Sequence, residues 1–452
     1  MTRAICLAAF CALLASCGGL LETLPAQLSA HPSAHDPFAP GENPLPVRLV
    51  RPPAGPLSAM AELGRAVFYD TGLSSSGRLS CASCHSPLHA YASPRREAVM
   101  RGGEALAREG LRAVPSLMYL ERQPSFSIGP DNEEDENVDM AKLIALSRGT
   151  APVPKKAPQA APSAVNMVPQ GGLFWDGRAD TLQAQALEPL LDPREMDGGS
   201  IETVAGKLRQ APYAAQLAQL FGASVFADSG LTVAEALFAV ARYQIEDASF
   251  HPYSSKFDAW LEGKARFSES ELRGYILYND PAKANCGGCH IDRPSRDGLP
   301  PLFTDHQFEA LGAPRNPALA ANRDAKFFDL GICGPSRGDM SGATQYCGFF
   351  MTPTLRNVAT RRVFFHNGVF STLRQVMDFY AFRDVEPQKI YPRRADGAVD
   401  IYNDLPPPYR ANVDKIDPPF DRKAGEKPAM TAQDEEDIIA FLSTLTDGYH
   451  PH

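Results

Sequence analysis

The sequence predicts a mostly α-helical fold in which a similar unit occurs twice. Long stretches of strand-like alternation are scarce, whereas several segments carry apolar residues at helical spacing. A predicted helix over residues 59–70 is followed by a Gly/Ser-rich loop and the motif Cys-x-x-Cys-His at residues 81–85. A second predicted helix, over residues 268–279, is followed by the same motif at residues 286–290. This recurrence predicts two domains.

The predicted domains span residues 57–255 and 256–452. Residues 121–168 interrupt the first domain with an acidic run and a stretch rich in proline, alanine and lysine. We interpret this insertion as a solvated surface loop, which is the usual state of such charge runs. The alternative is a lid, or an element that docks a partner, over the first motif.

Two further helices are predicted in the second half of the chain. One covers residues 371–382, and Thr372 and Gln375 form a candidate capping box at its start. The other lies near the C-terminus, where a second candidate capping box begins at Thr431 and Gly448 follows the last turn.

The N-terminus resembles an export signal. Residues 4–15 form an apolar run that is too short to span a bilayer as a mature helix. The run leads into a lipobox-like sequence at residues 14–18, so residues 1–17 are predicted to be a lipoprotein signal with Cys17 as the lipidated residue. The alternative is ordinary cleavage nearby. Residues 18–56 are rich in proline and alanine and predict a tether, and the expected location is the periplasm.

Charge and cysteine content narrow the function classes. The net charge is −9 and no basic block stands out, which argues against nucleic acid as a partner. Of the nine cysteines, Cys6 and Cys11 leave with the signal, Cys17 is the candidate lipid site, and four belong to the two motifs. Cys333 and Cys347 remain, and in an oxidising compartment this pair predicts a disulfide; the alternative is two free buried thiols.

The two motifs predict covalent attachment of two c-type haems. Two thiols at this spacing can bond the two vinyl groups of a porphyrin, and the adjacent histidine then reaches the iron from one side. A redox dithiol does not need the histidine, and structural zinc requires four ligands where each motif supplies three. The attachment residues are Cys81, Cys84 and His85 in the first motif and Cys286, Cys289 and His290 in the second.

The far side of each iron decides whether a haem transfers electrons or binds peroxide. Between His85 and residue 251 the only histidine is His89. It lies too close to the first motif to reach the opposite face of the haem easily. This favours an open first iron, although a methionine could ligate it. For the second iron, Met377 and Tyr380 share one face of the predicted helix, and their spacing leaves both open.

Around the motifs, the chain resembles the bacterial dihaem cytochrome c peroxidase/MauG family over residues 57–449, apart from the insertion. Its markers include Leu63-Gly-Arg65, Phe174-Trp-Asp-Gly-Arg-Ala179, Pro353-Thr-Leu-Arg-Asn-Val358 and Phe365-His-Asn-Gly368. The resemblance implies two cytochrome-c-like haem domains packed together. It also implies a haem peroxidase or oxidoreductase that uses hydrogen peroxide.

The resemblance further implies roles for four residues of the first domain. Glu195 is the expected general acid–base, because it could take a proton from bound peroxide and return it to the leaving oxygen. Gln185 and Pro189 are expected beside it over the open haem, with Gln185 orienting peroxide by hydrogen bonding. Trp175 is expected between the two haems, where an aromatic ring can relay electrons.

Tyr380 occupies the position at which ordinary members of the family have an axial methionine and MauG-type members have an axial tyrosine. A phenolate stabilises ferric and higher oxidation states, whereas methionine raises the potential. We therefore expect a MauG-like oxidase that acts on a periplasmic partner protein by long-range electron transfer. The alternatives are a cytochrome c peroxidase reduced by a small cytochrome or cupredoxin, and a non-enzymatic electron carrier.

The family also places calcium between the haems, held by an asparagine side chain and two backbone carbonyls. Ala113 stands at the asparagine position here, and the carbonyl positions fall near Arg361 and Val363. The expected side-chain ligand is therefore missing, and a calcium ion would need waters or the acidic segment instead.

Overall fold

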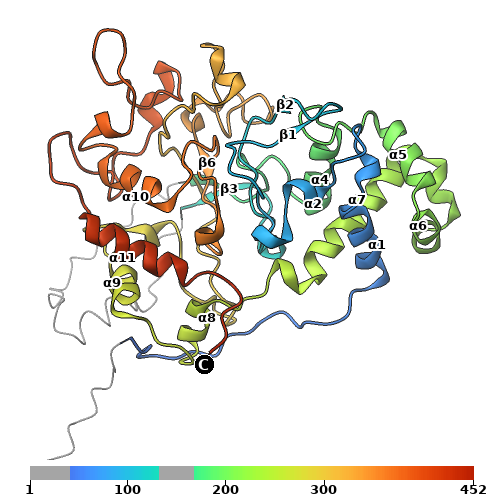
Figure 1. Cartoon of the computed structure of the whole chain (residues 1–452), viewed down its shortest axis with the longest axis horizontal. Coiled ribbons are helices and arrows are strands. Elements are labelled where there is room, and N and C mark those ends of the chain that lie inside the picture. The colour runs from blue at the N-terminus through green and yellow to red at the C-terminus, as the bar shows by residue number, and fades with distance from the viewer. Residues whose placement is uncertain (1–40, 132–166, 452) are drawn as a thin grey trace, which may run out of the picture.

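The computed structural model describes residues 41–131 and 167–451 (Figure 1). The predicted signal, the lipid site at Cys17, the first part of the predicted tether and most of the acidic run lie outside the described residues. Across the described ranges, none of the helices combines the length and apolar character that crossing a bilayer requires.

Helices and loops dominate the described chain, which confirms the prediction of a mostly α fold. The helices are α1 (Ala59–Phe68), α2 (Cys81–Cys84), α4 (Leu182–Leu191), α5 (Ile201–Gln210), α6 (Ala214–Phe221), α7 (Ser229–Glu246), α8 (Lys256–Leu261), α9 (Glu269–Tyr278), α10 (Leu373–Phe382) and α11 (Ala432–Ser443). The strands form three antiparallel pairs: β1 (Arg101–Gly102) with β2 (Arg108–Glu109), β3 (Ser127–Pro130) with β4 (Met167–Gln170), and β5 (Phe308–Glu309) with β6 (Phe350–Met351).

The four predicted helices are present as α1, α9, α10 and α11, each beginning just after a capping residue. The capping box at Thr431 is complete, because Thr431 and Asp434 satisfy each other's backbone amide. The predicted box at α10 is only half correct. Thr372 accepts from the Gln375 amide, but the Gln375 side chain accepts from Ser371 instead of Thr372.

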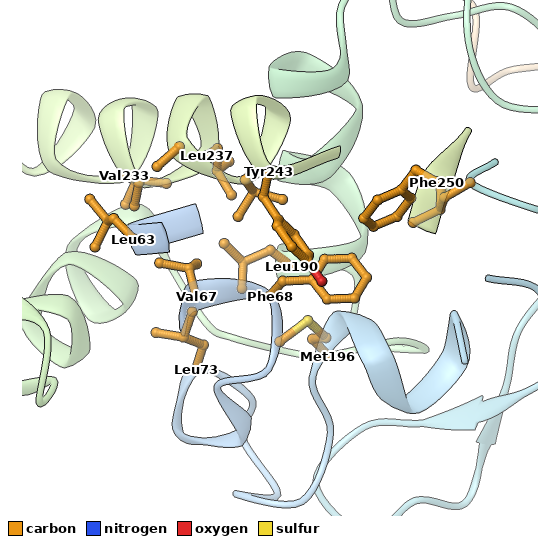
Figure 2. Packing of buried hydrophobic residues seen from close by; sticks show 14 of the residues in the cluster. Leu63, Val67, Phe68, Leu73, Leu190, Met196, Val233, Leu237, Tyr243 and Phe250 are labelled. Atoms are coloured by element: carbon orange, nitrogen blue, oxygen red, sulfur yellow. The ribbon is translucent and has the colours of Figure 1, made fainter. Parts of the chain in front are cut away.

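Two large apolar cores divide along the sequence. Except for Leu302, the first core draws its buried residues from the chain between Leu63 and Tyr253, and Figure 2 shows part of it. The second core, apart from Leu49, draws on the chain from Phe257 onward. The change of core thus falls near the predicted domain boundary, which itself stays a prediction.

Each core is organised around a helix crossing that needs a glycine. α1 packs on α7, and a Cβ at Gly64 would lie 1.8 Å from the carbonyl oxygen of Ala239. α9 packs on α11, and a Cβ at Gly274 would lie 1.9 Å from the carbonyl oxygen of Asp437. In both cases the helix that precedes a Cys-x-x-Cys-His motif approaches its partner backbone to backbone.

The described end of the predicted tether differs from a free linker. Residues 41–56 run along the second core, where Leu49 is buried. Arg51 donates two hydrogen bonds to the Glu262 carboxylate, at 2.9 and 3.0 Å. The composition of the segment does not reveal these contacts, because their partners lie far away in the sequence.

A buried ion pair joins the two cores. Arg356 donates to both carboxylate oxygens of Asp258, at 2.9 and 2.7 Å, and both side chains are almost fully buried. The guanidinium lies 4.9 Å from the ring centroids of both Tyr119 and Tyr253, which belong to the first core. Elsewhere in the second half, Cys333 and Cys347 form a disulfide.

Candidate active site

The first Cys-x-x-Cys-His motif forms α2 and presents a histidine that is ready to ligate a metal. The thiols of Cys81 and Cys84 are free. The His85 Nδ1 atom is 3.0 Å from the carbonyl oxygen of Tyr91, and the Pro115 backbone lies near the ring. Burial lowers the pKa of His85 to about 4, so the ring is neutral at pH 7. With Nδ1–H bound to a carbonyl, Nε2 is left for iron.

The second motif repeats this geometry. The His290 Nδ1 atom is 2.9 Å from the carbonyl oxygen of Phe303, and the Pro353 backbone takes the place of Pro115. Burial lowers the pKa of His290 to about 4 as well. The acceptors Tyr91 and Phe303 both have left-handed backbones, with φ of 50° and 56°. Strained backbone at both acceptors indicates that each carbonyl is held in place for its histidine.

A cavity of about 1130 Å³ opens beside the second motif, and Cys286, Cys289 and His290 line it. Tyr380 and Met377 both line it from α10, so the two candidates for the sixth ligand remain on the same wall. Their surroundings differ, however. Met377 belongs to the buried apolar core, whereas Tyr380 is partly buried beside it and stacks on Phe420, with ring centroids 5.3 Å apart.

Tyr380 is one of the residues that line this cavity. Burial raises the pKa of the Tyr380 phenol. Within the described part of the chain, no group hydrogen-bonds this hydroxyl. The hydroxyl is therefore available to a group bound in the cavity.

α4 and the turn that follows it carry Gln185, Pro189 and Glu195, the residues expected over the first haem. Gln185 is 8% exposed and lines a second cavity, of about 90 Å³, opposite Pro115. Pro189 lies one turn later in α4 and has no amide hydrogen, so it cannot bond the Gln185 carbonyl. Its own carbonyl oxygen accepts from the Met196 amide at 3.0 Å, which folds the next turn back onto the helix. Pro189 and Glu195 do not line the second cavity themselves.

Glu195 is held at the backbone and faces the first motif. The Gly103 amide donates to the Glu195 carbonyl at 2.9 Å, and a Cβ at Gly102 would lie only 2.1 Å from that carbonyl oxygen. Glu195 is exposed at the surface, yet many protein atoms lie around its carboxylate. This desolvation, together with the charge of Asp192, raises its pKa to about 7. The Glu195 charge also acts on the Cys81 and Cys84 thiols.

Trp175 lies between the two cavities and lines both of them. Its indole Nε1 donates to the Ala113 carbonyl at 2.9 Å. The next residue, Asp176, is fully buried and accepts from Arg112 and Arg178 at 2.7 and 2.8 Å, which fixes the backbone that carries the indole. The sequence-predicted Trp175 and Gln185 are thus brought to one cavity.

Two features of the described residues bear on the calcium site that the family places between the haems. The Ala113 carbonyl is used by Trp175, and the Ala113 amide donates to the His366 carbonyl at 2.7 Å. The charged residue that lines both cavities beside Trp175 is a cation, Arg361. Nowhere in the described part of the chain do three or more His, Cys, Asp or Glu side chains gather in a way that could hold a metal ion.

The ends of the insertion form β3 and β4 and lie at the second motif. Asp131, Met167 and Val168 line the larger cavity with His290. A backbone bridge joins Gln170 to Gln307, next to β5. The described ends of the insertion are therefore strands, and they lie next to the second motif. The alternative interpretation of the insertion, as a lid, had placed it over the first motif.

The sequence did not predict the carbonyl groups that orient the two histidines. It also did not predict that a cation would line both cavities. Tyr91 and Phe303 act through backbone carbonyls, for which the sequence carries no signal. Gly102 and Arg361 act through contacts with segments distant in sequence. The repetition of the motif was the available clue, because a repeated motif predicts that its supporting contacts recur.

The residues present fit a covalently bound haem at each motif. Each motif supplies two free thiols and a neutral histidine whose Nδ1 atom is occupied, which is what attachment and axial ligation require. At the second motif, the adjacent cavity with a mostly apolar lining adds the space for the group.

Comparison with known proteins gives the same result. The family model described as di-haem cytochrome c peroxidase matches residues 58–266. The chain is 30% identical over 402 residues to the methylamine utilization protein MauG of Paracoccus denitrificans, covering 86% of this chain and 89% of the relative. It is 26% identical to the cytochrome c551 peroxidase of Nitrosomonas europaea, covering 71% of this chain and 72% of the relative. The crystal structure of the diheme peroxidase BthA from Burkholderia thailandensis is similar, with a TM-score of 0.72 and 34% identity over 90% of this chain and 94% of that chain.

Proposed function

This chain belongs to the family of dihaem cytochrome c peroxidases and MauG, and we propose that it is a MauG-like oxidase that uses hydrogen peroxide to remove electrons from a partner protein. The family implies two covalently bound haem c groups and a haem oxidoreductase that acts on peroxide. The observation that carries the finer proposal is Tyr380, which lines the larger cavity together with His290 and whose hydroxyl has no hydrogen-bond partner among the described residues.

When bound, the two haems would supply a site for peroxide reduction at the first motif and a store of oxidising equivalents at the second. His85 and His290 would hold the irons through Nε2, because each Nδ1 is already bound to a carbonyl. Trp175 would lie between the two groups, since it lines both cavities. Tyr380 would complete the coordination at the second motif.

Glu195 is proposed as the group that moves protons at the first motif. A pKa of about 7 lets a carboxylate accept a proton from peroxide and return it at neutral pH. Gln185, buried on the wall of the smaller cavity, would orient peroxide through its side-chain amide.

A second candidate function rests on Met377. Because Met377 also lines the larger cavity, it could replace Tyr380 as ligand, and the protein would then be a cytochrome c peroxidase reduced by a small redox protein. The core position of Met377 speaks against this, since its side chain already packs against apolar neighbours.

The proposed location is the periplasm, with a lipid on Cys17 as the proposed anchor. A Cys17→Ser variant of the full chain should move from the membrane fraction to the soluble periplasmic fraction. Release of wild-type protein without membrane association would contradict the anchor and leave the enzyme proposal intact.

Two sets of variants test the proposed function. Glu195→Gln should slow peroxide-driven oxidation by about 10²–10⁴-fold, the usual contribution of a positioned acid–base, while both haems stay attached. Unchanged turnover would exclude this role. Tyr380→Met should change the optical and EPR spectra of the second haem strongly, and Met377→Leu should leave them unchanged. The reverse pattern would favour the cytochrome c peroxidase.

A further inference from the structure

Tyr91 connects the first histidine to a hydrogen-bonded exit at the protein surface. Its backbone carbonyl oxygen is 3.0 Å from the His85 Nδ1 atom. Its side chain is 3% exposed, yet its hydroxyl oxygen lies 2.6 Å from the Oγ of Ser249, a residue that is exposed. The same residue therefore touches the proposed iron ligand at one end and the solvent boundary at the other.

The hydrogen bonds of this exit have a defined direction. The Ser249 hydroxyl donates to the Oδ1 atom of Asp247 at 2.7 Å, because a carboxylate can only accept. Ser249 has one hydroxyl hydrogen, so the Tyr91 hydroxyl must be the donor in its bond to Ser249. The Ser249 amide also donates to Asp247 Oδ1, at 2.9 Å, which holds the carboxylate in place. A proton that leaves Tyr91 thus has a prepared acceptor.

An aromatic cluster continues from Tyr91 to the surface. The Tyr91 ring stacks on Phe250 with centroids 3.7 Å apart, and Tyr243 meets Phe250 edge-on at 5.2 Å. The Tyr69 ring meets the Tyr243 ring edge-on with centroids 6.5 Å apart. Burial raises the pKa of the Tyr243 phenol, and the nearby Tyr91 hydroxyl raises it further. Figure 2 shows Tyr243 and Phe250 among the apolar side chains of the first core. The last member, Tyr69, is 45% exposed, so the chain of phenols ends in solvent.

We propose that Tyr91 is a redox-active tyrosine, with Ser249 and Asp247 as its proton acceptors and Tyr243 and Tyr69 as the continuation to the surface. The proposal rests on the proposed reaction with hydrogen peroxide. Reduction of one peroxide to two waters consumes two electrons and two protons. The two protons come from solvent, and the two electrons would be withdrawn from the haem sites. Tyr91 would return one electron to the first haem site, while its phenolic proton passes to Ser249 and the Ser249 proton passes to Asp247.

The remaining steps return Tyr91 to its resting state. Tyr243 gives a hydrogen atom to the Tyr91 radical, and Tyr69 gives one to Tyr243, so the unpaired electron ends at the exposed phenol. The second oxidising equivalent stays in the protein for the partner. The relay thus provides an outlet on the histidine side of the first haem when no partner is bound.

The test uses the full-length protein with both haems, mixed with hydrogen peroxide in the absence of any partner and frozen for EPR. Wild-type protein should show a tyrosyl radical, identified by the narrowing of its signal when tyrosine is ring-deuterated. Tyr91→Phe keeps the ring and the backbone carbonyl and should lose this signal. Ser249→Ala and Asp247→Asn should delay it by roughly 10²-fold, the lower end of what a positioned proton acceptor contributes.

A matched control is Tyr391→Phe. Tyr391 is equally buried, at 3% exposed, but its hydroxyl donates to the Gly312 carbonyl at 2.6 Å, and a backbone carbonyl cannot take the proton. This variant should keep the wild-type signal. An equal tyrosyl signal in Tyr91→Phe would overturn the proposal, as would its absence from wild-type protein whose haem absorption responds to peroxide. If the haem absorption does not respond at all, the proposed function fails first and the relay fails with it.

Discussion

Replacing Gly102 by alanine tests whether the position of Glu195 is set by backbone packing. The backbone of Gly102 is in an ordinary conformation that alanine can adopt, so the effect of the added methyl group is steric. The new Cβ would lie 2.1 Å from the Glu195 carbonyl oxygen and 2.4 Å from that of Arg194, whereas real contacts are essentially never below 3.0 Å. The turn that carries Glu195 must therefore move by roughly 0.9 Å.

A displacement of that size predicts a large effect on rate. A shift of about 1 Å in a catalytic group can cost about 10²-fold, which corresponds to about 2.7 kcal/mol in the activation free energy. Overpacking should also lower the free energy of unfolding, by about 1–3 kcal/mol. The assay is the rate constant for the reaction of the dihaem protein with hydrogen peroxide, followed optically, together with denaturant unfolding.

Two controls separate the catalytic effect from the loss of stability. Gly274→Ala places a Cβ 1.9 Å from the Asp437 carbonyl, a clash of the same kind in the second core, and should lower stability without slowing the peroxide reaction. Gly206→Ala meets nothing within 4 Å in the middle of α5 and should stabilise by up to about 1 kcal/mol. If Gly102→Ala reacts as fast as Gly274→Ala, the backbone of Gly102 does not position Glu195.

Three further predictions concern charge. Glu195 must be ionised to accept a proton, and its pKa is raised to about 7. The rate constant for the reaction with peroxide should therefore rise roughly tenfold per pH unit up to about pH 7 and then level off. A flat profile from pH 5 to 8 would exclude Glu195 as the base. Ala113 offers no side-chain oxygen, and the nearby cation Arg361 would repel a metal ion. Treatment with a chelator should therefore leave both haem spectra and the rate of the peroxide reaction unchanged. Elemental analysis should find no stoichiometric calcium. Asp258→Asn leaves the Arg356 charge buried without a partner and should lower the free energy of unfolding by about 3–5 kcal/mol; a change below about 1 kcal/mol in denaturant unfolding would mean that the pair is solvated.

Much of the fold could be predicted because its signals are local. Apolar spacing and capping residues identified α1, α9, α10 and α11, and these signals act within one or two turns of helix. The partial error at the start of α10 is also local, since Ser371 competes with Thr372 for the Gln375 side chain. Residues 41–56 were predicted to be a tether because the groups that they contact lie about two hundred residues later in the sequence.

The haem motifs belong to the part that the sequence determines by itself. Covalent attachment requires two thiols and a histidine at fixed spacing within one short segment, so five consecutive residues carry the whole signal. Two such segments, a remaining pair of cysteines and a run of family markers are enough to predict a dihaem protein that acts on peroxide.

The inequality of the two motifs is decided by tertiary structure. Cys81 and Cys286 begin motifs that look equivalent, and both histidines are oriented by a carbonyl from a left-handed residue. The differences come from segments far away in sequence: Glu195 with a raised pKa on one side, and Tyr380 with an unbonded hydroxyl on the other. Burial and long-range contacts set the pKa and partners of a side chain, and the spacing of residues along the chain carries neither.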